Sequence, residues 1–191
     1  MKRRYWFPKH YADVVQRLRV TAGFGLLAAF LWFSEPVAAT MAVGLPVSLM
    51  GLALRAWAAG HLAKNESLAV AGPYALTRNP LYLGSLIVAL GLAVAGASVF
   101  LTLLFVTVFV LVYYPVMELE EQHLRNLFPG YAEYADRVPL LLPVAGAKGP
   151  LGELRGSQWR RNEEYKALLR FLIGVAYVAG RSGLVSVPGL P

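Results

Sequence analysis

Four long apolar runs constrain the fold of this chain more than any other feature of its sequence. They are residues 20–33, 37–59, 81–95 and 99–116. A helix needs about 20 predominantly apolar residues to cross the hydrocarbon core of a bilayer. The first run reaches that length when Val14, Val15 and Leu18 extend it. We therefore predict an all-α, polytopic integral membrane protein with four main transmembrane helices and additional cytoplasmic amphipathic helices.

Composition argues against a soluble enzyme or a disordered chain. Of the 191 residues, 57% are hydrophobic and 15% are charged, whereas soluble domains average about 45–50% and about 25%. The mean hydropathy is +0.52. The chain has no cysteine, which excludes disulfides and thiolate metal sites. Its three histidines, His10, His61 and His123, lack the spacing of a metal-binding motif, so we predict no metal site.

The distribution of basic residues predicts the topology. All 18 Lys and Arg residues fall in 1–19, 55–78 and 125–181, while the turns at 34–36 and 96–98 contain none. Basic loops of membrane proteins face the cytoplasm, so we expect all three basic regions and both termini to be cytoplasmic. The net charge of +7 is then explained without nucleic acid, and the predicted partners are membrane lipids. The compact chain is typical of a bacterial inner-membrane protein.

We predict one membrane-embedded domain over residues 1–145, followed by a C-terminal extension over residues 146–191. The first 19 residues are basic and aromatic, as in an amphipathic segment at the membrane surface. They lack the apolar core of a cleavable signal peptide, so none is expected. The apolar stretch 167–180 in the extension is short for a span. Its length favours an interfacial or docked helix over a fifth crossing.

The first candidate site surrounds the start of the third apolar run. Asn79 is a good N-cap and Pro80 suits the first helical position. Gly84 is explained by close helix packing. Arg78 places a cation at the mouth of this helix, where free N–H groups also favour anions. The pattern leaves open whether Arg78 binds an anionic ligand or a lipid headgroup.

The second candidate site follows the fourth apolar run. At helical spacing, Glu120 and Glu121 share a face with Leu124, Leu127 and Phe128, and Glu118 falls on the opposite face. Carboxylates on an apolar face are costly unless they meet a cation or a donor, which favours a functional role. The alternative is that Pro115 opens a new helix whose N-terminus favours acidic residues.

Together, these two segments resemble the isoprenylcysteine carboxyl methyltransferase family, which is related to the phospholipid N-methyltransferases. The family has a G-x-Y…R-H-P-x-Y-x-G element before a transmembrane helix, and a Glu-Glu pair followed by F-G-x-x-Y-x-x-Y…V-P…P after the next helix. The first element here reads Gly72-Pro73-Tyr74…Arg78-Asn79-Pro80-Leu81-Tyr82-Leu83-Gly84. The second reads Glu120-Glu121, Leu124, Phe128-Pro129-Gly130-Tyr131, Tyr134, Val138-Pro139 and Pro143. The family histidine is Asn79 here, and Pro129 interrupts the Phe-Gly pair.

The resemblance implies a methyltransferase that uses S-adenosyl-L-methionine at the cytoplasmic membrane face. The implied acceptor is lipidic or a small hydrophobic molecule, with O-methylation of an isoprenylcysteine-like carboxylate favoured. The implied catalytic residues are Arg78 and Glu121. The implied cofactor-binding residues are Tyr74, Arg78, Asn79, Pro80, Leu81, Tyr82, Gly84, Glu120 and Glu121. Two alternatives remain open: a nicotinamide-dependent membrane reductase of the sterol reductase type, and a membrane scaffold inactivated by the change at Asn79. The oligomeric state is also open.

Overall fold

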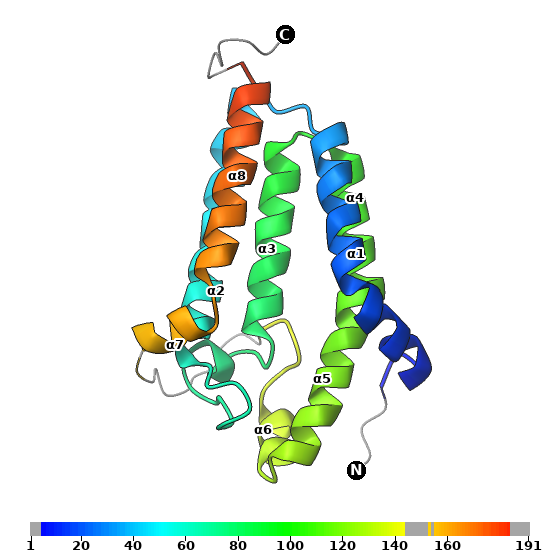
Figure 1. Cartoon of the computed structure of the whole chain (residues 1–191), viewed down its shortest axis with the longest axis vertical. Helices are drawn as coiled ribbons and strands as arrows, with labels where there is room; N and C mark the ends of the chain where they lie inside the picture. The colour runs from blue at the N-terminus through cyan, green and yellow to red at the C-terminus, as the bar shows by residue number, and fades with distance from the viewer. Residues whose placement is uncertain (1–4, 144–152, 154, 184–191) are drawn as a thin grey trace.

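The computed structural model describes residues 5–143, 153 and 155–183, and every regular element in these ranges is helical. Long helices lie side by side along the long axis of the molecule, and the short ones gather at its lower end (Figure 1). The predicted all-α fold is therefore confirmed. The predicted boundary between residues 145 and 146 lies outside the described residues. The elements are α1 (Lys9–Phe33), α2 (Ala38–His61), the 3-10 helix η1 (Gly72–Ala75), α3 (Pro80–Ala95), α4 (Val99–Val108), the π-helical η2 (Phe109–Tyr113), α5 (Tyr114–Leu127), α6 (Tyr131–Arg137), α7 (Gly156–Arg161) and α8 (Tyr165–Arg181).

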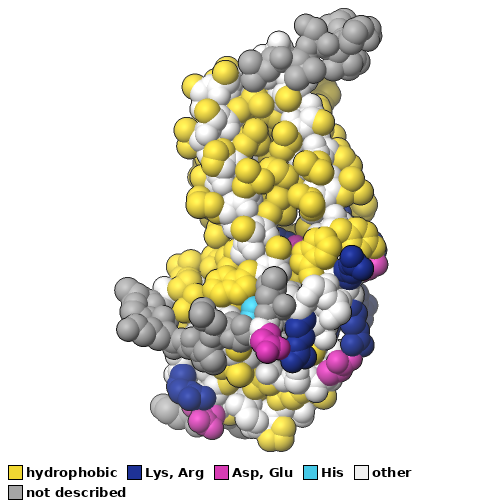
Figure 2. Space-filling view, turned by 90° about the vertical axis from the view of Figure 1, so that its left-hand side faces the viewer, with side chains coloured by type: hydrophobic (Ala, Val, Ile, Leu, Met, Phe, Trp, Pro, Cys, Tyr) yellow, Lys and Arg dark blue, Asp and Glu magenta, His cyan; other side chains and the backbone are white. Residues whose placement is uncertain are grey.

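Among the described residues, three helices are long and apolar enough to cross a membrane: Lys9–Phe33, Ala38–His61 and the continuous helix Val99–Leu127. The fourth predicted span, α3, is apolar but has only 16 residues. Figure 2 shows apolar side chains over the upper part of one face and charged side chains gathered on its lower part. This division is the one expected of a protein whose upper part lies in lipid and whose lower part meets water.

Helices α2 and α3 pack closely because small residues face each other. A Cβ atom added to Gly44 would lie 2.4 Å from the backbone oxygen of Gly91, and one added to Gly84 would lie 2.8 Å from that of Gly51. Between them, the hydroxyl of Ser48 donates to the carbonyl of Val88 at 3.0 Å. Small residues allow this close approach in lipid, where apolar burial does not drive helices together. Gly84 therefore has the role in close helix packing that we predict from the sequence.

The fourth apolar run and the acidic segment after it form one continuous helix, so the alternative in which Pro115 opens a new helix is wrong. Proline has no N–H for the carbonyl four residues earlier, which here belongs to Leu111. The hydroxyl of Tyr11 donates to this carbonyl at 2.7 Å. The π-helical turn Phe109–Tyr113 directly before the proline takes up the altered backbone.

The N-terminal segment is fastened to α5 by Glu118. The backbone N–H of Trp6 donates to Glu118 Oε1 at 2.9 Å, and that of Phe7 donates to Oε2 at 3.1 Å. Glu118 is only 1% exposed. The prediction that Glu118 lies on the opposite, outward face is therefore wrong. Helix α1 begins at Lys9, so residues 9–19 of the predicted amphipathic segment 1–19 belong to the same helix as the first apolar run.

Replacing Glu118 by alanine should destabilise the protein. The change leaves two N–H groups near the start of α1 without their acceptor, and each unsatisfied buried group costs about 1–3 kcal/mol. We expect a lower free energy of unfolding in detergent, together with faster proteolysis of the N-terminal segment. Asp136→Ala, at an exposed position, is the control. Equal stability of the two variants would contradict this role of Glu118.

Helix α8 docks along the bundle instead of lying at the interface. Arg181 Nε donates to the carbonyl of Ser34 at 3.0 Å, and the hydroxyl of Tyr177 donates to that of Leu31. The turns at 34–36 and 96–98 also meet at this end, where the N–H of Glu35 donates to the carbonyl of Gly96 at 2.8 Å. Helix α8 thus runs from the lower end to the far turns (Figure 1). The described ends of the chain lie at opposite ends of the bundle, which does not fit the prediction that both termini share one side.

Candidate functional site

A cavity of about 490 Å³ lies below the apolar part of the bundle. Its walls come from the end of α2, the loop after it, η1, the first turns of α3, the lower half of α5, α6 and the junction of α7 with α8. Both motif segments of the sequence contribute to this cavity. The predicted site residues that line it are Tyr74, Arg78, Asn79, Leu81, Tyr82 and Glu120.

Arg78 and Glu121 form a buried ion pair beside the cavity. Their side chains are 6% and 1% exposed, and Arg78 Nη1 lies 2.9 Å from Glu121 Oε1. The same oxygen accepts from Arg125 Nε and Nη2 at 3.1 and 2.9 Å. Glu121 therefore holds two guanidinium groups, although it is not among the residues that line the cavity. Arg78 lines the cavity, and its buried Nε–H has no acceptor within the described residues.

Glu120 lies in a different environment from Glu121. It lines the cavity and is about half exposed. The hydroxyl of Tyr82 donates to Glu120 Oε1 at 2.9 Å, and Arg19 Nη1 lies 3.7 Å from the same oxygen. The predicted pairing of Glu120 and Glu121 on one buried face is therefore wrong. The buried pair is Glu118 and Glu121, three residues apart, while Glu120 is turned toward the cavity.

Four tyrosines surround the cavity: Tyr74, Tyr82, Tyr131 and Tyr134. The hydroxyl of Tyr134 donates to the carbonyl of Tyr74 at 2.7 Å, which joins α6 to η1. Burial raises the pKa of Tyr131 to about 12. Burial also raises the pKa of Tyr74 and of Tyr134. These three phenols stay neutral at physiological pH, so they can donate hydrogen bonds and offer ring faces but cannot serve as anionic bases.

The remaining predicted residues have structural roles around the cavity. Pro80 is buried as the first residue of α3. Asn79 occupies the N-cap position without a side-chain cap. Its Nδ2 donates instead to the carbonyl of Leu140 at 3.0 Å, which fastens the chain after α6 to the start of α3. Pro80, Gly84 and Glu121 are not among the residues lining the cavity.

Sequence reasoning missed Arg55 and Glu164. Both residues line the cavity. Arg55 Nε and Nη2 donate to the two carboxylate oxygens of Glu164 at 2.6 and 3.0 Å. Arg55 Nη1 also donates to the carbonyl of Leu81 at 3.2 Å and to the hydroxyl of Ser85. A charge within an apolar run is an indication of function, which could have identified Arg55. No local pattern indicates Glu164.

The arrangement suits a ligand that carries charges of both signs and a flat ring. The residues that line the cavity include Arg78, a cation that can attract an anion, Glu120, a carboxylate that can attract a cation, and four tyrosines with aromatic rings. Within the described ranges, no three His, Asp or Glu side chains are grouped as a metal site.

Comparison with known proteins places the chain in a family. The profile of the phospholipid methyltransferase family matches residues 18–130. A cobalt-zinc-cadmium resistance protein, CzcN, from Cupriavidus metallidurans is 34% identical over 114 residues, which are 59% of this chain and 51% of that protein. A nickel-cobalt-cadmium resistance protein, NccN, from Alcaligenes xylosoxydans xylosoxydans is 32% identical over 114 residues, 59% of this chain and 52% of that protein. The chain spans about half the length of these relatives, and no solved structure matches it. On the extent of the profile match, this integral membrane protein belongs to the phospholipid methyltransferase family.

Proposed function

We propose that this protein transfers a methyl group from S-adenosyl-L-methionine to a lipidic or small hydrophobic acceptor at the cytoplasmic face of the membrane. The observation that carries the proposal is the cavity wall, which contains the carboxylate of Glu120 and the side chain of Arg78, whose buried Nε–H has no acceptor within the described residues. The family match supports methyl transfer as the reaction.

The residues of the cavity fit the cofactor's chemical groups. Its carboxylate would take the free N–H of Arg78, a charge-assisted hydrogen bond. Its ammonium group or its sulfonium would take Glu120, a cavity carboxylate whose ion pair among the described residues is a loose one, with the partly exposed Arg19 at 3.7 Å. The rings of Tyr74 and Tyr131 would pack against its adenine.

The chain itself would contribute to methyl transfer by aligning the cofactor with the acceptor and by excluding water. When bound, the cofactor supplies an activated methyl group, and its transfer is an in-line displacement that depends on orientation. The neutral tyrosines at the cavity offer no anionic base, so a base for an amine acceptor would have to be Glu120 or His123, which also line the cavity. A carboxylate acceptor is already deprotonated at neutral pH and needs no base. We therefore favour O-methylation of an isoprenylcysteine-like carboxylate over methylation of an amine.

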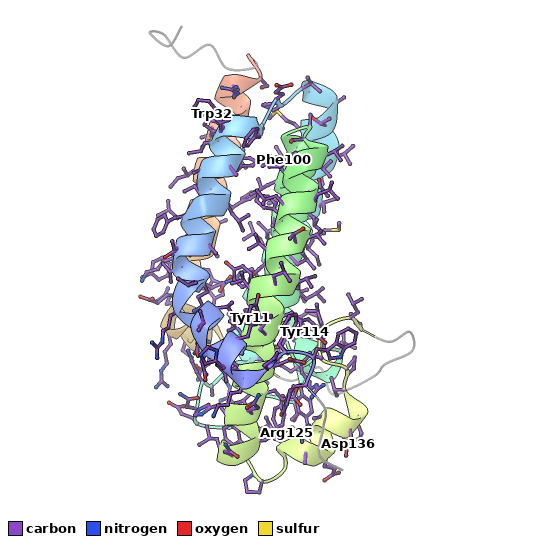
Figure 3. The ribbon with its side chains drawn as sticks, turned by 90° about the vertical axis from the view of Figure 1, so that its right-hand side faces the viewer. Tyr11, Trp32, Phe100, Tyr114, Arg125 and Asp136 are labelled. Atoms are coloured by element: carbon purple, nitrogen blue, oxygen red, sulfur yellow. The ribbon has the colours of Figure 1, made fainter. Side chains whose placement is uncertain are left out.

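We propose that α1, α2, α3 and the helix Val99–Leu127 cross the bilayer, that α8 lies in it beside them and reaches the far turns, and that the cavity end faces the cytoplasm. In Figure 3, Trp32 and Phe100 lie near one end of the bundle, and Tyr11 and Tyr114 lie toward the other. Aromatic side chains of this kind mark membrane interfaces. The 22 residues from Tyr11 to Trp32 rise roughly 30 Å in a helix, about the thickness of the hydrocarbon core. An acceptor with an apolar tail can then reach the cavity from the membrane.

The relatives are named for resistance to metals, but we propose methyl transfer instead of metal binding for this chain. The carboxylates of Glu121 and Glu164 are each engaged by arginine, so their charge is already matched without an ion. The two other candidates are the nicotinamide-dependent reductase and the inactive scaffold. Each gives a different result in a binding experiment.

The test is calorimetric titration of the purified protein in detergent with S-adenosylmethionine, S-adenosylhomocysteine and NADPH. We expect the first two to bind and NADPH not to bind. Glu120→Gln should weaken the binding of S-adenosylmethionine by about tenfold or more, because one charge-assisted contact is lost. Glu133→Gln, in an exposed ion pair with Arg137, should bind as the wild type does. Binding of NADPH alone would support the reductase, and binding of none of the three would support the scaffold.

A further inference from the structure

The segment that contains α7 and α8 lies beyond the family match at residues 18–130, yet it contributes to the cavity. Asn162 and Glu164, at the junction of the two helices, both line it. Figure 1 shows α7 at the lower end of α2, with α8 rising from there along the same helix. This segment therefore completes a site whose other walls come from the part of the chain that matches the family.

Three contacts fasten the junction to the end of α2 and the loop after it. Asn162 Nδ2 donates to the carbonyls of Ala59 and Leu62 at 2.9 and 2.8 Å. These carbonyls lie in the last turn of α2 and just after it, where the regular i→i−4 hydrogen bonds of the helix end. In addition, Arg161 Nη2 lies 2.6 Å from Glu66 Oε1. The position of Glu164 relative to the cavity is thus set by Arg161 and Asn162, which lie just before it in the same segment.

Glu164 in turn fixes Arg55. Both carboxylate oxygens accept from the guanidinium group in the planar, two-point geometry that arginine and carboxylates share. The third nitrogen, Nη1, then reaches the carbonyl of Leu81 and the hydroxyl of Ser85 in the first turns of α3. Leu81 and its neighbour Tyr82 are themselves part of the cavity wall. Glu164 is therefore connected through Arg55 to the residues beside the proposed cofactor site.

The same pair sets the charge of the cavity. Glu164 is 7% exposed in its side chain and Arg55 is 22% exposed, so the attraction between them is weakly screened by water. While Glu164 is ionised, it matches the cation of Arg55 and leaves the carboxylate of Glu120 as the group available to a cationic ligand. Without Glu164, a cation would remain in the wall of the cavity.

We infer that Glu164 is a positioning residue of the S-adenosylmethionine site, which holds Arg55 against α3 and neutralises it so that the cavity accepts a sulfonium cation. This inference rests on the proposed function. It assigns to the C-terminal segment a part in cofactor selection.

The test compares the affinities for S-adenosylmethionine, whose sulfur is cationic, and S-adenosylhomocysteine, whose sulfur is neutral, in the detergent-solubilised full chain. Glu164→Gln should weaken the binding of S-adenosylmethionine about tenfold more than that of S-adenosylhomocysteine, because an unmatched cation repels the sulfonium, the one charge that the second ligand lacks. Glu163→Gln is the matched control. Its carboxylate is exposed, pairs with Lys166 and is not among the residues that line the cavity, so the affinity ratio should not change.

A second variant distinguishes an effect of charge on binding from an effect on folding. Arg55→Gln/Glu164→Gln removes both charges and should restore the wild-type affinity ratio, even where both absolute affinities fall or Glu164→Gln alone folds poorly. Equal losses for the two ligands in Glu164→Gln, or an unrestored ratio in the double variant, would overturn the inference. Wild-type protein that binds neither ligand would instead overturn the proposed function.

Discussion

Replacing Glu121 by glutamine should lower the free energy of unfolding by about 3–5 kcal/mol, the cost of breaking a buried ion pair by removing one partner. Glu121 Oε1 accepts from both Arg78 and Arg125, and the side chains of Glu121 and Arg78 are nearly inaccessible to water. An amide leaves both guanidinium groups without a counter-charge. Because Arg78 lines the cavity, we also expect cofactor affinity to fall in any fraction that remains folded.

Glu133→Gln is the matched control for this prediction. Glu133 and Arg137 also form an ion pair four residues apart, but their side chains are 79% and 70% exposed. Exposed ion pairs contribute about 0–1 kcal/mol to stability, so the midpoint of the unfolding transition should hardly change. The measurement is denaturant unfolding in detergent, followed by circular dichroism. Equal shifts in the two variants would show that Glu121 is not the buried centre of this ion cluster.

The ends of the helices could be predicted from sequence because their signals are local. Pro80 fits only the first turn of a helix, and α3 begins there. The run that it opens ends at Ala95, followed by the predicted turn. Pro115 shows the limit of the same rule. There, the π-helical turn before the proline and the hydroxyl of Tyr11, about 100 residues away, let the helix continue.

The face of α5 could not be predicted, because periodicity assigns a face from the apolar residues of the helix itself. Glu118 is buried by a partner outside that helix, the backbone of Trp6 and Phe7. Glu121 is buried by Arg78. Both partners are polar groups brought in by other segments, and the pattern of leucines in α5 contains no information about them.

Residues of the candidate site that belong to a sequence motif could be predicted. Residues that reach the site only through contacts between distant segments were missed. Tyr74, Arg78 and Tyr82 were identified from their own segment, and they line the cavity. Arg55 and Glu164 are 109 residues apart, and Glu164 belongs to a helix junction without a recognisable pattern. Their pairing depends on how α8 docks beside α2, which only the folded chain determines.

Gly91→Leu should destabilise the protein by about 3 kcal/mol or more, at the upper end of what overpacking costs. A Cβ atom on Gly91 would lie 2.5 Å from the backbone nitrogen of Ser48 and 2.6 Å from the backbone oxygen of Gly44. Neither backbone atom can move unless α2 moves away from α3. That movement would also separate Arg55 on α2 from the carbonyl of Leu81 on α3, so we expect a loss of cofactor affinity together with the loss of stability.

Gly25→Leu is the control that decides whether packing or helix propensity causes the effect. Nothing lies within 4 Å of a Cβ atom at Gly25, and this position is exposed in the middle of α1. Leucine favours a helix over glycine by about 0.5–1 kcal/mol, so this variant should be slightly more stable than the wild type. Thermal unfolding in detergent should therefore shift in opposite directions for the two substitutions. Shifts in the same direction would mean that α2 and α3 are not held at the distance set by their glycines.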